Sequence, residues 1–116
     1  MNIPVEIMLR QNPEVFTRHV EHPGDPRHWA VEDVRAVLKA ILAAVNGVQH
    51  PDGASTGVPV TLRGLSWIVS PYQDGVVIAF EIHSASVVAG PFHVDEQLLG
   101  NLVAGAVAAE RADTVH

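Results

Sequence analysis

A stripe of apolar residues at helical spacing limits the folds that this chain can adopt. The stripe lies within residues 31–45 and consists of Val31, Val34, Leu38, Ile41, Leu42 and Val45. Acidic residues in its first turn suit a helix start, and Asn46 with Gly47 is typical of a helix end. A helix with one apolar face must bury that face, so the rest of the chain has to supply a second layer.

Segments before and after this helix in the sequence alternate apolar and polar residues, which predicts that the second layer is a sheet. Residues 3–9 and 14–21 form one expected hairpin around Asn12 and Pro13. Residues 60–69 and 76–84 form another, joined by the turn at 71–75. The apolar parity of the third segment changes at Gly64, which predicts a β-bulge there. Residues 86–91 either add a short fifth strand or lead directly into the last element.

A second helix is expected to begin at Asp95 and Glu96 and to carry an apolar face as far as Val107. The predicted order is ββαββα. We therefore expect a two-layer α+β fold with a mainly antiparallel sheet of four strands, or five if residues 86–91 join it, and both helices on one face. A chain of 116 residues has the usual size of one domain, so residues 1–116 are assigned to one domain with a frayed tail at 112–116.

The charge balance excludes several partners. The net charge is −6, and the seven basic residues are scattered along the chain, whereas nucleic acids and anionic membranes select clustered basic groups. The chain has no cysteine, which excludes disulfides and cysteine-bound zinc. Its first residues lack a signal-peptide pattern, and no apolar stretch reaches the roughly 20 residues that span a bilayer. We expect a cytoplasmic protein of a bacterial-type cell that binds neither nucleic acid nor membrane.

Two pairs of residues with ligand chemistry stand at i, i+2 spacing in predicted strands. These are His19 with Glu21, and Glu81 with His83. Each pair would place an imidazole and a carboxylate on the same side of its strand. If the two strands are neighbours, the four side chains could bind a divalent metal such as Zn²⁺, Fe²⁺ or Mn²⁺. The simpler interpretation, that they are polar residues on the solvent face of a sheet, is favoured.

No catalytic motif stands out among the remaining residues. The serines lack the context of a nucleophile elbow, and the loop histidines, His22 among them, have no partner that the sequence places nearby. Trp67 alternates with apolar neighbours and is expected in the core. Trp29 precedes the first helix, where it packs against that helix, caps an edge of the core or lines a pocket.

The most informative feature of the sequence is that apolar residues also occupy positions expected outside the core, while charged residues are few. Only 17% of residues are charged, compared with about 25% in typical soluble domains. The second helix is nearly apolar around its circumference, and the outward parity of the sheet also contains apolar residues. We therefore expect a homodimer or a higher closed assembly. Its interface would use either the small-residue ridge Gly100, Ala104 and Ala108 or the open sheet face with Ile68, Val77 and Ala79.

These observations support two hypotheses about function. The first is a small non-enzymatic assembly or binding module that acts as a homo-oligomer, with itself or another protein as partner and without a cofactor. The second is a small metal-dependent or His-assisted enzyme, or a ligand-binding domain, that uses the His and Glu pairs on the sheet. The lack of a specific catalytic motif favours the first hypothesis.

Overall fold

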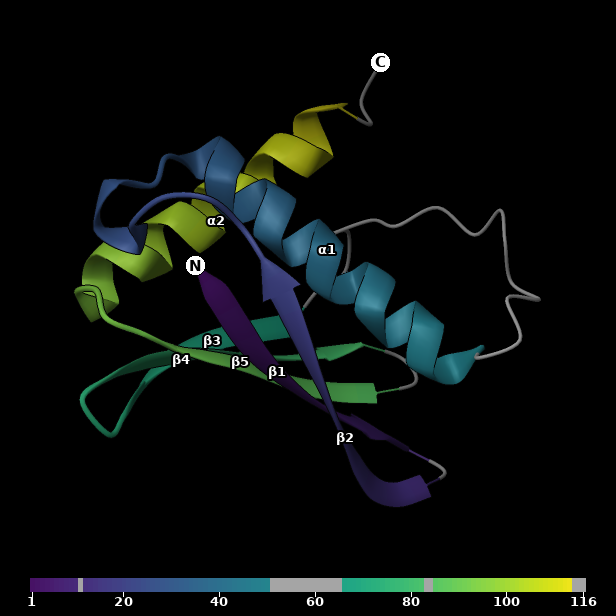
Figure 1. The fold of residues 1–116 in the computed structure, drawn as a ribbon. Helices are drawn as coiled ribbons and strands as arrows, with labels where there is room; N and C mark the ends of the chain where they lie inside the picture. Colours follow the sequence, from purple (N-terminus) through teal and green to yellow (C-terminus); the bar gives the residue numbers. More distant parts are fainter. Residues whose placement is uncertain (11, 51–65, 83–84, 114–116) are drawn as a thin grey trace.

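The computed structural model describes residues 1–10, 12–50, 66–82 and 85–113, which form one antiparallel sheet and two long helices (Figure 1). The strands are β1 (Asn2–Leu9), β2 (Asn12–Glu21), β3 (Ser66–Tyr72), β4 (Gly75–Ile82) and β5 (Ala85–Phe92). The helices are α1 (Val31–Gln49), α2 (Glu96–Asp113) and the short 3₁₀ helix η1 (Pro26–His28).

Within the described residues, the sheet has five strands in the order β2-β1-β5-β4-β3, and every neighbouring pair is antiparallel. Both helices lie on the same side of it (Figure 1). The α+β class and the one-sided covering are as predicted. The element order is ββαβββα rather than ββαββα, because residues 86–91 belong to a complete strand. That strand, β5, is the middle of the sheet and joins the two halves of the chain.

Gly90 and Pro91 made β5 hard to recognise from the sequence. Proline lacks a backbone N–H, and such residues usually mark the end of a strand. Here the pairing of β4 with β5 shifts register between Val76 and Ile78, opposite this dipeptide. Gly90 has a φ of 124°, and a Cβ at this position would lie 3.0 Å from the carbonyl oxygen of Val76. The irregularity therefore lets the strand continue to Phe92, whose side chain is fully buried.

The core lies between the inner face of the sheet and the helices. Ile3, Val5 and Ile7 of β1 are fully buried, and the predicted stripe of α1 faces the same core. The helix does not end at Asn46 and Gly47, as the sequence suggested, but continues to Gln49. Val48 extends the buried stripe by one more position and is 8% exposed. Burial of this side chain outweighs the helix-ending tendency of the preceding Asn-Gly pair.

The helices approach each other closely at Gly105 of α2. A Cβ at this position would lie 2.9 Å from a side-chain carbon of Val31 in α1, a distance too short for two carbon atoms. Gly100, one residue of the predicted ridge, has open space around the corresponding position. The close contact in α2 is therefore made by a glycine outside the ridge.

Neither α1 nor α2, as described, combines the length and apolar character needed to cross a membrane.

Several element boundaries differ from the sequence predictions. Strand β2 begins at Asn12, so the Asn-Pro dipeptide belongs to an edge strand, where a proline needs no partner for its nitrogen. Strand β3 includes Pro71 and Tyr72, and the turn to β4 is made by Gln73 and Asp74 alone. Helix α2 continues to Asp113, inside the expected frayed tail. The bulge predicted at Gly64 lies outside the described residues.

We predict opposite effects for the same substitution at two glycines of α2. Gly100→Ala replaces a helical glycine where space is open, and should raise the free energy of unfolding by up to about 1 kcal/mol. Gly105→Ala forces the methyl group against Val31, so the free energy of unfolding should fall by about 1 kcal/mol. Urea denaturation measures both. An equal gain in the two variants would contradict the close packing of α1 on α2.

Candidate functional site

The face of the sheet that points away from the helices is the candidate site. Side chains alternate along a strand, so the neighbours of the buried Ile3, Val5 and Ile7 point to this open face. The strand registers then place residues of all five strands in rows that run across the face. One row contains, from β2 to β3, Thr17, Glu6, Val88, Ala79 and Ile68.

The open face exposes large apolar side chains. Val88 of the central strand is 41% exposed, and Ile68 of the edge strand β3 is 59% exposed. Met8 and Val15, which pair directly in the neighbouring row, are 46% and 49% exposed. Within the described part of the chain, both long helices lie on the other side of the sheet (Figure 1). Apolar side chains in register across several strands form a surface suited to burial against a second layer.

Acidic residues interrupt this apolar surface at two positions. Glu6 pairs with Val88 on one side and Thr17 on the other. Glu81 lies in the neighbouring row, opposite Ser66 and Ser86. Both glutamates are exposed. Their negative charges restrict the surfaces that can pack on the open face, because a partner must not bring another acid to the same place.

The residues predicted for a sheet interface differ in their accessibility. Ile68 is the most exposed large apolar residue of the open face, and Ala79 lies beside it in the same row, half-buried. Val77 faces Ser70 across β3 and β4 but is only 8% exposed, so it offers little contact area. Met8, Val15 and Val88 have the accessible surface that Val77 lacks.

The alternative interface was the small-residue ridge of α2. Ala104 and Ala108 are exposed, and Gly100 is half-buried with open space beside it. Leu98 in the first turn of the helix is 40% exposed. The inner side of α2, with Leu99, Val103 and Ala106, is fully buried. The ridge is thus accessible, but its small side chains expose much less apolar area than the row that contains Val88 and Ile68.

The predicted metal ligands are distributed over strands that are not neighbours. His19 and Glu21 lie on β2 and Glu81 lies on β4, with β1 and β5 between these strands. Three strand spacings correspond to about 14 Å, too far for one ion with ligand distances near 2 Å. His83 lies outside the described residues. Among those that are described, no group of three or more His, Asp or Glu residues is positioned to hold a metal ion.

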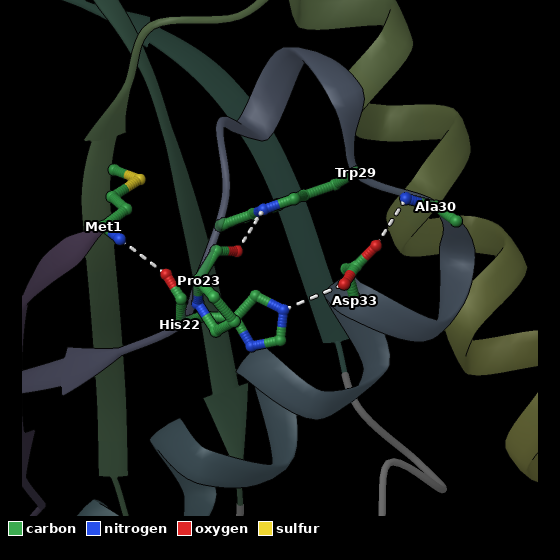
Figure 2. Close-up of polar contacts among 6 residues, drawn as sticks. All are labelled: Met1, His22, Pro23, Trp29, Ala30 and Asp33. Carbon is green, nitrogen blue, oxygen red and sulfur yellow. Dashed lines mark hydrogen bonds and ion pairs between the residues drawn. The ribbon is translucent and has the colours of Figure 1, made fainter.

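A His–Asp pair that the sequence did not reveal lies where β2 leads into α1 (Figure 2). Nε2 of His22 is 3.0 Å from Oδ1 of Asp33. An ionised carboxylate can only accept hydrogen bonds, so Nε2 carries the hydrogen and donates it. The backbone N–H of His22 also donates to the carbonyl oxygen of Met1. The imidazole side chain is only 16% exposed. His22 therefore connects the beginning of the sheet to the first turn of α1.

Asp33, in the first turn of α1, also caps the start of this helix. Its second carboxylate oxygen accepts the backbone N–H of Ala30 at 2.8 Å, the reciprocal half of a capping box. The hydrogen bond from Ala30, followed by that from His22, lowers the pKa of Asp33 below its ordinary value of 3.8. Sequence reasoning recognised the acids of the first turn as helix-start signals. It could not identify His22 as a partner, because the loop that returns His22 to Asp33 has no regular pattern.

Trp29 lies beside this pair and belongs to the core. Its Nε1–H donates to the carbonyl oxygen of Pro23 at 3.2 Å, and the residue is 8% exposed. Its ring packs edge-on against the rings of His22 and Phe92, with centroids 5.3 and 6.0 Å away. These contacts match the packing role considered for Trp29. They hold the loop before α1 against the central strand, and so fix where the helix starts.

The chain was compared with models of protein families, with curated proteins and with solved structures, and none of the three comparisons found a match.

We predict that Asp33→Asn reduces the stability of the fold at neutral pH. The substitution should also weaken the dependence of this stability on pH in the acidic range. Because folding lowers the pKa of Asp33, its carboxylate stabilises the fold above pH 3.8, and this contribution is lost as the pH falls through the folded-state pKa. The variant should therefore lose less stability than the wild type below about pH 4. Thermal unfolding between neutral and acidic pH measures this difference.

Glu32→Gln is the matched control, because it removes the same charge from the same helical turn. A change in stability that both variants share results from the loss of negative charge at the start of the helix. If Asp33→Asn and Glu32→Gln have the same pH profile, the hydrogen bonds of Asp33 do not stabilise the start of α1.

Proposed function

We propose that the chain is a non-enzymatic assembly module that forms a homodimer through the open face of its sheet. The observation that carries this proposal is the exposure of Met8, Val15, Ile68 and Val88 on one face, between 41% and 59%. Association of two such faces would remove these side chains from water and form a β-sandwich between two outer layers of helices.

The size of the open face supports a second copy as the partner. Five strands about 4.8 Å apart span roughly 24 Å, and eight residues along a strand span roughly 26 Å. The flat area is therefore about 600 Å², and the accessible surface of the side chains is larger. A stable interface typically buries about 800 Å² of each partner. A second copy offers a surface of the same size and the same apolar rows.

The composition of the chain supports the same partner. The hydrophobic fraction of 47% is usual for a globular protein, but the charged fraction is only 17%, so fewer charged side chains than usual are available to cover the surface. Symmetric dimers are the commonest closed assemblies of identical chains, and they require a surface that complements itself. The mixture of apolar side chains, serines and Thr17 on the open face meets this requirement, provided that the acids do not face each other.

Sedimentation velocity and native mass spectrometry of chelator-free protein test the proposal. We expect a metal-free dimer of about 25 kDa, twice the 12.4 kDa of one chain. Val88→Glu places a charge at the centre of the open face and should weaken the dimer more than about tenfold. Ala104→Glu, on the exposed side of α2, introduces the same charge and should leave the dimer intact.

Three results would contradict the proposal. A wild-type chain that stays monomeric at high concentration would exclude the homodimer. Loss of the dimer in Ala104→Glu but not in Val88→Glu would assign the interface to the ridge of α2. A stoichiometric Zn, Fe or Mn ion that is present in the wild type and absent from the His83→Ala variant would favour a metal-dependent function instead.

A further inference from the structure

The strand registers restrict how two copies can meet on the open face, given the proposed homodimer. The faces overlap fully only if the two-fold axis passes over β5, because β5 is the third of five strands. On β5, Val88 is the exposed apolar side chain, with Glu6 on one side and Ala79 on the other. A two-fold axis over Val88 therefore places Val88 of one copy against Val88 of the other.

Two directions of the axis give aligned sheets, and they bring different residues together. If the axis runs across the strands, each residue of the central row meets its own copy. Glu6 then faces Glu6 of the second chain. If the axis runs along β5, the two ends of the row exchange places. Glu6 then faces Ala79, and Thr17 faces Ile68.

The charges distinguish these two arrangements. Two carboxylates buried against each other repel strongly in the low dielectric of an interface, with no cation from the same row to compensate. The axis along β5 avoids this contact for Glu6 and for Glu81. It places Glu6 opposite Ala79, and Glu81 opposite Met8 of the neighbouring row. Each acid then meets an uncharged side chain and can turn its carboxylate toward Thr17, the serines or the solvent at the edge of the face.

We infer that the homodimer has its two-fold axis parallel to β5 and over Val88, so that edge strand β2 of one copy lies on edge strand β3 of the other. This arrangement determines which residues of the two chains lie close together. Thr17 of one copy lies about one sheet spacing, roughly 10 Å, from Ile68 of the other. Thr17 and its own copy lie on opposite sides of the dimer, separated by about four strand spacings, or roughly 19 Å, in addition to the sheet spacing.

Cross-linking of single-cysteine variants tests this inference, because the chain contains no cysteine of its own. Thr17→Cys and Ile68→Cys are prepared separately, one of them with ¹⁵N, and are then mixed so that subunits exchange. A thiol-to-thiol reagent with a reach near 10 Å should cross-link the mixed dimer. Mass spectrometry identifies the mixed product by its isotope content. Each variant alone should give little cross-linked product, because its two copies lie on opposite sides of the dimer.

The results of this experiment distinguish a wrong axis from a wrong proposal of a homodimer. Strong cross-linking of Thr17→Cys or Ile68→Cys to its own copy, without a mixed product, would overturn the inference in favour of an axis across the strands. An intact dimer without any of these cross-links would overturn it in favour of orthogonal sheets or another surface. A monomer in sedimentation velocity, with both variants folded by circular dichroism, would overturn the inference together with the homodimer.

Discussion

The packing of both long helices on one face of a single sheet determines most other properties of the molecule. It gives β1, β4 and β5 one fully apolar side, where Ile3, Ile78 and Phe92 are buried. It also leaves the second side of the same strands without a layer from the described chain (Figure 1). The exposed apolar side chains of that second side favour burial against a further layer. The proposed homodimer supplies the missing cover with a surface of the same size and chemistry.

The position of β5 connects the core to the open face. Because β5 is the central strand, its inward residues Val87 and Ala89 lie in the middle of the core, and Val88 lies in the middle of the opposite face. The junction of His22, Trp29 and Asp33 contributes in another way, since it fixes the start of α1 over the inner face. Its hydrogen bonds give the polar groups of Trp29 and Asp33 local structural roles.

The sequence predicted what depends on periodicity. The stripe of α1 and the two hairpins follow from spacings of 3.6 or 2 residues, and they are present in the described residues. Strand order depends on contacts between distant segments, so the separation of His19 from Glu81 was not predictable. Strand β5 was uncertain because Gly90 and Pro91 resemble a strand end. The close approach at Gly105 depends on the angle at which the two helices cross, which no local pattern specifies.

Isotope-filtered NMR of a mixture of ¹³C-labelled and unlabelled protein tests the central claim most directly. It detects contacts only between chains, and methyl groups mark both candidate surfaces. A homodimer through the open face predicts intermolecular contacts from the methyl groups of Met8, Ile68 and Val88, and none from Ala104 or Ala108. Intermolecular contacts from the two alanines alone, or no intermolecular contacts at high concentration, would contradict it.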